Sequence, residues 1–337
     1  MHVLIIGGSS FLGRATAREA LRRGAEVTTF NRGRTGPDVR GVQALRGDRE
    51  SDGDLAQLAG RPFDVVVDTC GFVPAVVGRS AAVLAGSGAH YAFVSSISAT
   101  TTWPAAPTPD GDPGQDCPAD AGANDGDYGR LKAGCERAVT EAFGDRATVV
   151  RAGLILGPHE NVGRLPWWLE RMARGGEVLA PGDPDRPMQL VDARDIASFV
   201  LDTAQTGTGG TFNVTGPRGN ASMGSWLADC VAATGSAADL TWVADDFLVD
   251  RDVSPWTELP LWMPPGQDGD HVWDAETTAA EDAGLRCRPV TETVLDTWAW
   301  MQSGGRPPVM PPHDHLPSHG IDADKERRLL AEWHARA

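Results

Sequence analysis

Two residue types that are rare in this chain, tyrosine and lysine, occur four positions apart as Tyr128 and Lys132. The 337 residues include two tyrosines, and only two of the 30 basic residues are lysines. Positions i and i+4 share one face of a helix, so the two side chains are expected to be neighbours. An ammonium beside a phenol stabilises the phenolate, which can give or take a proton at a carbonyl or alcohol. We therefore predict that Tyr128 and Lys132 are catalytic.

A group of serines, Ser95-Ser96-Ile97-Ser98, ends an apolar run that begins at Tyr91. If this run is a strand of a parallel sheet, its carboxyl end opens on the ligand crevice. A serine hydroxyl there can polarise a carbonyl beside the tyrosine. Ser96 is the preferred catalytic hydroxyl and Ser98 the alternative, with Ser98 otherwise a substrate contact. A plain loop role for both serines stays open.

A glycine-rich turn, Gly7-Gly8-Ser9-Ser10-Phe11-Leu12-Gly13, separates the first apolar run from a helical pattern. Gly7 permits a tight turn and Gly13 permits close helix packing, while the helix N-terminus offers N–H groups to a pyrophosphate. Ser10 departs from a G-x-x-G-x-x-G pattern, so the backbone is expected to approach the phosphates less closely there. The predicted cofactor contacts from this turn are Gly7, Ser9, Ser10, Phe11, Leu12 and Gly13.

The end of the second apolar run bears on the choice of cofactor. An NAD-preferring fold of this kind places an acidic residue there for the ribose 2′-hydroxyl, whereas this chain has Asn31, Arg32 and Arg34. Asn31 does not repel a 2′-phosphate, and an arginine can pair with one. NADP(H) is therefore preferred and NAD(H) remains the alternative. Asp48 is a candidate contact for adenine, with a solvated loop position as the alternative.

Other predicted cofactor contacts follow a strand that ends at Asp68. They are Thr69, Cys70 and Gly71, together with Lys132 from the catalytic pair. For the three residues after Asp68, a buried structural role is the alternative.

The elements that must position these residues alternate between strand and helix, which predicts a doubly wound parallel sheet of the Rossmann type. The expected strands cover residues 3–6, 26–30, 42–45, 63–68, 91–95 and 148–156. The expected helices cover residues 15–23 and 128–143, and a Pro-, Gly- and Asp-rich loop covers 103–126.

Beyond residue 157 the alternation fades. Helices are expected at 165–174, 195–204, 225–234, 291–301 and 322–336, and extended segments at 188–191 and 212–214. Asp195 is expected to cap its helix. We predict a dinucleotide-binding domain formed by residues 1–156 and 188–215. Residues 157–187 and 216–337 would form a smaller substrate-binding domain with a C-terminal helix.

Composition excludes several classes of protein. The net charge of −16 disfavours nucleic acid as a partner. No apolar run approaches the length of a membrane span, and the N-terminus enters a strand directly, so a cytoplasmic location is expected. The five scattered cysteines are expected to be reduced. His313, Asp314, His315 and His319 lie in a proline-rich tail without a typical ligand spacing, so no metal site is predicted.

Four residues after Gly157 are candidate substrate contacts. His159 is expected to line the pocket, and Arg164, Trp167 and Trp168 could hold a ring or a phosphate. Core packing by one of the tryptophans is the alternative.

Taken together, these motifs resemble the extended or atypical short-chain dehydrogenase/reductase superfamily, specifically its NAD-dependent epimerase/dehydratase group. The supporting segments are the Gly7–Gly13 turn, Ser95-Ser96, Tyr128 to Lys132, Arg151 to Pro158, Gln189 to Asp195, and Phe212 to Pro217. The resemblance implies a catalytic triad of Ser96, Tyr128 and Lys132. It also implies that the substrate domain begins after Gly157.

The resemblance implies a nicotinamide-dependent reductase, dehydrogenase or epimerase acting on a carbonyl or alcohol of a small polar metabolite. A sugar nucleotide or a natural-product intermediate is expected, and the protein is expected to be a monomer or homodimer. Some relatives with similar glycine turns, the chloroplast stem-loop RNA-binding proteins, work on RNA, and others are redox-silent. The Tyr128/Lys132 pair and the charge of −16 argue against both alternatives.

Overall fold

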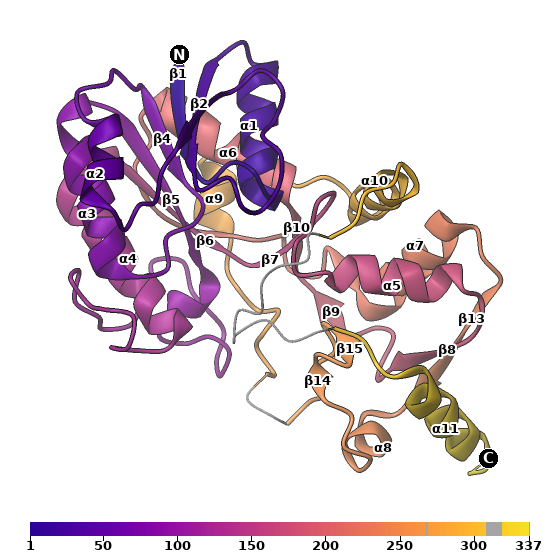
Figure 1. The fold of residues 1–337 in the computed structure, drawn as a ribbon. Helices are drawn as coiled ribbons and strands as arrows, with labels where there is room; N and C mark the ends of the chain where they lie inside the picture. The colour runs from indigo at the N-terminus through magenta and orange to yellow at the C-terminus, as the bar shows by residue number, and fades with distance from the viewer. Residues whose placement is uncertain (267–268, 308–318, 337) are drawn as a thin grey trace. The chain divides into compact units, whose positions relative to one another are not determined.

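The computed structural model describes residues 1–266, 269–307 and 319–336, and within them seven parallel strands form the central sheet (Figure 1). The strand order is β11-β6-β5-β4-β1-β2-β3. In that order the strands are β11 (Gly210–Val214), β6 (Ala147–Ala152), β5 (His90–Ser96), β4 (Val65–Asp68), β1 (His2–Ile6), β2 (Glu26–Asn31) and β3 (Gln43–Arg46).

The two faces of the sheet bury alternate residues of each strand. In β1, Val3 and Ile5 belong to one apolar cluster and Leu4 and Ile6 to the other, as the two-residue period of a strand requires. Helices α1 (Phe11–Arg22) and α6 (Ala193–Thr206) cover the first face, and α3 (Pro74–Leu84) and α4 (Tyr128–Phe143) cover the second (Figure 1). The predicted doubly wound, Rossmann-type α/β fold is confirmed.

The order of the strands reverses between β1 and β4. From β1 the chain moves outward to β2 and β3, then returns to β4 and continues through β5 and β6 to the other edge. In such a sheet, ligands bind outside the carboxyl ends of the strands at the point of reversal.

Contacts divide the chain into two units. The first contains Met1–Ile155, Val191–Pro217 and Asp274–Cys287, and the second contains Leu156–Leu190, Arg218–Trp273 and Arg288–Ala337. The sequence predicts that everything after residue 215 belongs to the second domain, whereas the contacts group Asp274–Cys287 with the first unit. That segment is tied to the first unit by a backbone pairing at Thr108 and by the amide of Asn213, which donates to the Glu276 carbonyl at 3.0 Å.

The second unit contains short strands and several helices. Its parallel pair is β8 (Gly176–Pro181) with β13 (Ala238–Val243). The chain passes from one unit to the other within β7 (Leu154–Leu156) and within β10 (Leu190–Asp192). The other short strands are β9 (Pro187–Met188), β12 (Ala221–Ser222), β14 (Pro255–Trp256) and β15 (Leu259–Pro260).

The helices of the second unit are α5 (Arg164–Ala173), α7 (Met223–Thr234), α8 (Asp245–Val249), α10 (Val290–Gln302) and α11 (Ala323–His334). Two short helices, α2 (Asp52–Leu55) and α9 (Thr278–Asp282), belong to the first unit.

Two local predictions differ from the structure. The single strand expected at 148–156 is two strands, because Gly153 interrupts it between β6 and β7. Asp195 does not cap α6. The cap is Asp192, whose carboxylate accepts the Arg194 amide at 2.8 Å, so the helix begins two residues earlier than expected.

Within the described residues, no helix is both long enough and apolar enough to cross a membrane.

Candidate active site

The carboxyl ends of four adjacent strands bring the predicted cofactor segments to one edge of the sheet. Gly7 follows β1, Asn31 ends β2, Thr69 follows β4 and Ser96 ends β5. These strands are parallel neighbours, so their carboxyl ends lie together.

The glycine turn is closely packed. Gly7 has a φ of 110°, and its amide donates to the Phe30 carbonyl at 2.9 Å. A β-carbon on Gly13 would lie 2.6 Å from the Gly8 nitrogen, so only glycine fits there. Ser10 precedes α1, and within the described residues its buried hydroxyl has no hydrogen-bond partner. An unpartnered hydroxyl beside the free N–H groups of a helix N-terminus suits a phosphate, so the residues present fit a dinucleotide.

At the end of β2, Asn31 connects the glycine turn to the following loop. Its amide nitrogen donates to the Gly7 carbonyl at 3.1 Å, and its amide oxygen accepts the Gly33 nitrogen at 2.8 Å. Arg46 donates to the same oxygen and pairs with Asp38. The hydrogen bond from Arg46 lowers the pKa of Asp38, so this carboxylate remains charged close to Asn31. Asp38 was not predicted from the sequence, because it lies seven residues beyond the end of β2.

Arg32 and Arg34 are both exposed beyond the end of β2. The Arg32 guanidinium lies 3.8 Å from the carboxylate of Asp48, and both side chains remain partly exposed. An ion pair of this kind holds its partners weakly. The Ser9 hydroxyl lies 2.7 Å from that of Thr35, so a hydrogen bond joins the glycine turn to the loop that carries Arg32 and Arg34.

Lys132 is buried, with 3% of its surface exposed. Its ammonium donates to the carbonyls of Val94 at 2.6 Å and Gly71 at 2.8 Å. It also lies 4.5 Å from the ring centroid of Phe93 and 5.4 Å from that of Phe72. Carbonyl dipoles and ring faces compensate the charge for its lost hydration. Of the two carbonyls that hold it, that of Val94 lies within β5 and that of Gly71 lies in the segment after β4.

Tyr128 is the first residue of α4 and is 52% exposed. Asp127 caps this helix, its carboxylate accepting the Arg130 amide at 2.9 Å. No hydrogen bond or ring contact joins Tyr128 to Lys132 among the described residues.

The other tyrosine, Tyr91, has a structural role. Its hydroxyl donates to Asp68 at 3.0 Å, and Arg49 donates to both oxygens of that carboxylate at 2.7 and 2.9 Å. Burial raises the pKa of Tyr91 well above its ordinary value, which removes it as an acid–base group. Sequence reasoning missed Arg49, although an aspartate ending an apolar strand needs a buried cationic partner.

The two candidate serines contact each other. The Ser96 hydroxyl donates to that of Ser98 at 3.2 Å and accepts the Ser98 amide at the same distance. Ser96 thus caps the 3-10 turn Ile97–Ala99, and Ser98 orients its hydroxyl. Both remain candidates for the hydroxyl that meets a substrate.

Ser98, one of the predicted substrate contacts, lies in the first unit, and the other four lie in the second. His159 packs on Trp300 with ring centroids 4.9 Å apart, and the Arg164 guanidinium lies 5.9 Å from the ring of Trp256. Trp168 is fully buried and its indole donates to the Pro260 carbonyl at 2.9 Å. Trp168 is thus a core residue, which is the alternative that the sequence left open for one of the tryptophans.

Trp167 packs edge to face against Trp168, and a β-carbon on Gly320 would collide with the Trp167 indole. Sequence reasoning missed Glu160, which is fully buried and accepts the amides of Arg164 at 2.8 Å and Leu165 at 3.2 Å. Burial raises the pKa of Glu160 to about 7. The first amides of helix α5 therefore donate to a carboxyl group whose pKa is raised to about 7 by burial.

His313, Asp314 and His315 lie outside the described residues. In the described part of the chain, no group of three or more His, Cys, Asp or Glu side chains is placed to hold a metal ion.

Comparisons with known proteins concern the family and the fold of the chain. Residues 3–215 match the model of the NAD dependent epimerase/dehydratase family. UDP-glucose 4-epimerase from Thermotoga maritima, solved with UDP-glucose, is 17% identical with a TM-score of 0.67, covering 90% of this chain and 99% of that chain. The Bordetella bronchiseptica enzyme WbmH in complex with NAD+ is 16% identical with a TM-score of 0.68, covering 90% and 99%.

A dTDP-4-dehydrorhamnose reductase from Clostridium acetobutylicum is 16% identical with a TM-score of 0.62, covering 90% of this chain and 100% of that chain. At these identities the likeness concerns the fold. A search of curated protein sequences gave no significant match.

Proposed function

Because the chain belongs to the NAD-dependent epimerase/dehydratase family, we propose that it is an oxidoreductase or epimerase acting on a carbonyl or alcohol of a small polar metabolite. The observation that carries this proposal is the half-exposed phenol of Tyr128, which begins α4 four residues before the buried ammonium of Lys132. Tyr91 and Lys325 are occupied elsewhere, Lys325 by an ion pair with Glu258 at 2.7 Å. Tyr128 and Lys132 are therefore the tyrosine and the lysine that remain for catalysis.

Tyr128 is the proposed proton donor and acceptor. The phenol passes a proton to or from the substrate oxygen, and the buried Lys132 ammonium lies four residues further along α4. When substrate binds, the Ser96 hydroxyl turns its one proton from the Ser98 oxygen to the same substrate oxygen and stabilises the charge that develops there. A nicotinamide cofactor, when bound, supplies or accepts the hydride.

The proposed cofactor contacts are the residues of the glycine turn, the loop after β2, Asp48, the segment after β4, and Lys132. Ser10 and the N-terminus of α1 would hold the pyrophosphate, and Thr69 to Gly71 would lie beside the nicotinamide half. NADP(H) is the proposed preference, supported by the exposed Arg32 and Arg34 and by the neutral side chain of Asn31.

The proposed substrate is a sugar nucleotide or a natural-product intermediate, and His159, Arg164 and Trp167 are the proposed contacts in the second unit. Arg164 supplies a cation and Trp167 an aromatic face, which suit a phosphate and a ring respectively.

Cofactor titration tests the proposal directly. The purified full chain is titrated with NADPH and with NADH while nucleotide fluorescence and the thermal midpoint are followed, and binding with a rise in the midpoint is expected. Oxidation of the bound nucleotide is then followed with 4-keto sugar nucleotides, and interconversion is followed with UDP-glucose. Failure to bind either nucleotide would overturn the enzyme assignment.

A further inference from the structure

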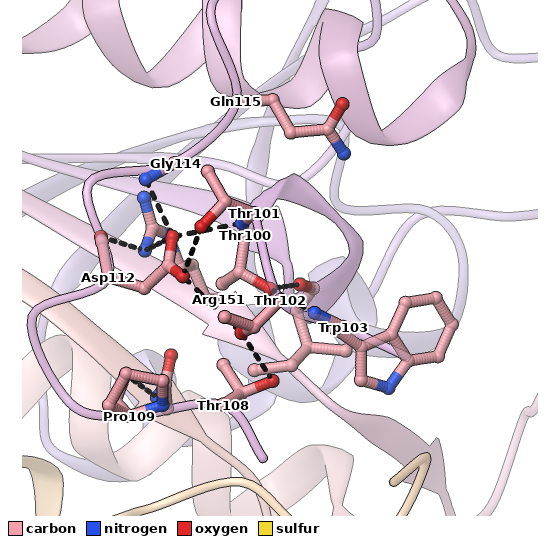
Figure 2. Close-up of polar contacts among 12 residues, drawn as sticks. Thr100, Thr101, Thr102, Trp103, Thr108, Pro109, Asp112, Gly114, Gln115 and Arg151 are labelled. Carbon is pink, nitrogen blue, oxygen red and sulfur yellow. Dashed lines mark hydrogen bonds and ion pairs between the residues drawn. The ribbon is translucent and has the colours of Figure 1, made fainter. Parts of the chain in front are cut away.

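The loop between β5 and α4 is built around one buried carboxylate, Asp112. Its Oδ1 accepts the backbone amides of Thr101 at 3.0 Å and Gly114 at 2.8 Å, and its Oδ2 accepts the Thr101 hydroxyl at 2.8 Å and the Thr102 hydroxyl at 3.3 Å (Figure 2). Four donors from both ends of the loop thus meet on one side chain that is 6% exposed. Asp112 lies eleven residues after Thr101 and two before Gly114, so its carboxylate joins the two ends of the loop.

Arg151, at the end of β6, attaches this carboxylate residue to the sheet. Its guanidinium donates to the Asp112 carbonyl at 2.6 Å and lies 3.9 Å from the Asp112 carboxylate. The other two guanidinium nitrogens of Arg151 donate to the carboxylate of Glu136, in α4, at 2.8 to 3.2 Å. The Ser95 hydroxyl also donates to Glu136. Loop, sheet and helix therefore share one buried network, in which removing a single partner leaves others unsatisfied.

Burial opposes ionisation of Asp112, but the amides of Thr101 and Gly114, the Thr101 hydroxyl and Arg151 outweigh it and lower its pKa. The carboxylate therefore stays charged, and an ionised acceptor makes shorter and stronger hydrogen bonds than a neutral one.

The loop ends on the candidate catalytic serines. The Gln115 amide nitrogen donates to the Ala99 carbonyl at 2.8 Å, and its side-chain amide donates to the Ser98 carbonyl at 2.8 Å. Gln115 follows Gly114 directly, and Gly114 is one of the four donors to Asp112. Two hydrogen bonds therefore connect the Asp112 carboxylate to Ser98, one through Gly114 and one through Gln115. They fix the position of Ser98 and, through it, the orientation of the Ser96 hydroxyl.

We propose that Asp112 is a positioning residue, which holds the loop Thr101–Gln115 so that Ser98 and Ser96 stay in register with the start of α4. This inference rests on the proposed function, because positioning matters only if these serines meet a substrate. It adds a residue to the site that touches neither substrate nor cofactor.

Two variants and a matched control test it. Asp112→Ala removes all four acceptor bonds, whereas Asp112→Asn keeps an acceptor oxygen for the two amides. Asp116→Ala is the control, since Asp116 lies four residues away on the same loop with its side chain 97% exposed. Each full-length protein is examined by hydrogen–deuterium exchange of peptides covering residues 96–115, by NADPH affinity, and by kcat and KM for a turned-over carbonyl substrate.

Asp112→Ala is expected to speed exchange of the Ser98, Thr101 and Gly114 amides, and to lower kcat about 10- to 100-fold while KM and NADPH affinity change less than about threefold. Asp112→Asn is expected to recover most of kcat, and Asp116→Ala to match the wild type. If Asp112→Ala does not fold, Gln115→Ala cuts only the last link and is expected to lower kcat in the same way.

Unchanged kcat in Asp112→Ala despite faster exchange would overturn the proposal, and so would a fall in kcat matched by an equal loss of NADPH affinity. Absence of turnover in the wild type would contradict the proposed function instead. In that case unchanged exchange of the Ser98 amide in Asp112→Ala overturns the positioning role, and faster exchange supports it.

Discussion

Gly129 packs directly against the carbonyl oxygen of Ser98. A β-carbon at residue 129 would overlap that oxygen, and it would lie 2.9 Å from the side-chain nitrogen of Gln115. Only glycine therefore lets the first turn of α4 approach the serine loop this closely. The distance between the phenol of Tyr128 and the serine hydroxyls depends on this contact.

Replacing Gly129 with alanine tests the contact. Gly129→Ala is expected to lower the free energy of unfolding by about 1–3 kcal/mol, because the helix or the serine loop must shift. The kcat of the folded protein is also expected to fall, because the shift moves the Tyr128 phenol relative to the serine hydroxyls. Gly78→Ala is the control, since a β-carbon in that helix meets only ordinary contacts at 3.8 Å. It is expected to raise the thermal midpoint slightly, because alanine favours a helix. A Gly129→Ala protein as stable and active as the wild type would show that the approach is not required.

Tyr128→Phe removes the proposed proton donor and keeps the ring. We expect turnover to fall by about 10²- to 10⁴-fold, with NADPH affinity nearly unchanged, because the hydroxyl serves the transition state and the ring remains. Steady-state kinetics and nucleotide titration measure both quantities. Tyr91→Phe is an unsuitable control, since it leaves Asp68 short of a donor. Undiminished turnover in Tyr128→Phe would assign the proton to another group.

The two lysines offer a matched pair of substitutions. Lys132→Arg is expected to lower the free energy of unfolding by about 1–3 kcal/mol and to weaken cofactor binding, because a planar guanidinium cannot replace a compact ammonium between two carbonyls. Lys325→Arg is expected to be neutral within about 0.5 kcal/mol, since its partner Glu258 accepts either cation. Urea unfolding of both variants makes the comparison. Equal effects at the two positions would contradict a special role for Lys132.

Arg32 carries the proposed cofactor preference. Arg32→Ala is expected to raise the Kd for NADPH about tenfold and that for NADH less than about threefold, because only NADPH presents a 2′-phosphate. Arg40→Ala serves as the control, since Arg40 is an exposed arginine further along the loop after β2 and is not a proposed cofactor contact. Equal weakening of both nucleotides would remove the preference for NADP(H).

Glu160 predicts a pH dependence of stability. Burial raises its folded pKa to about 7 from an ordinary 4.5, so the folded state favours the protonated form. The contribution of Glu160 to the free energy of unfolding is largest below about pH 4.5. It falls by up to about 3 kcal/mol as the pH rises to about 7. Glu160→Gln is expected to lack this loss, so the free energies of unfolding of the two proteins diverge across that range. Glu170→Gln, exposed on α5, is expected to follow the wild type. Parallel curves for Glu160→Gln and the wild type would contradict the raised pKa.

The sequence was most informative where a local pattern determines the structure. Helix α4 spans the predicted residues, because Asp127 supplies a cap and Gly144 ends the apolar periodicity. The strands of the central sheet were recognisable from apolar runs that end in polar or glycine residues. Helix α3 was missed, since Arg79 is its single charged residue and its pattern has little amphipathic contrast.

Pairings between distant residues were not predictable from local patterns. The parallel pair β8–β13 joins segments about 60 residues apart, and Asp274–Cys287 returns to the first unit through contacts with Thr108 and Asn213. In the candidate site, the motif residues were found but their partners were not. Arg49 and Asp112 act through side chains far away in sequence, and no spacing rule connects them to Asp68 or to Ser98.

The two carbonyls that hold Lys132 have a consequence for how a ligand is received. A flexible lysine loses about 2 kcal/mol of rotamer entropy when it is fixed, and here that loss occurs during folding rather than on binding. Two of the three ammonium hydrogens already point at Val94 and Gly71. The third is therefore preorganised along one direction. A hydroxyl that arrives along that line gains a charge-assisted bond at little further entropic cost, and one that arrives elsewhere does not.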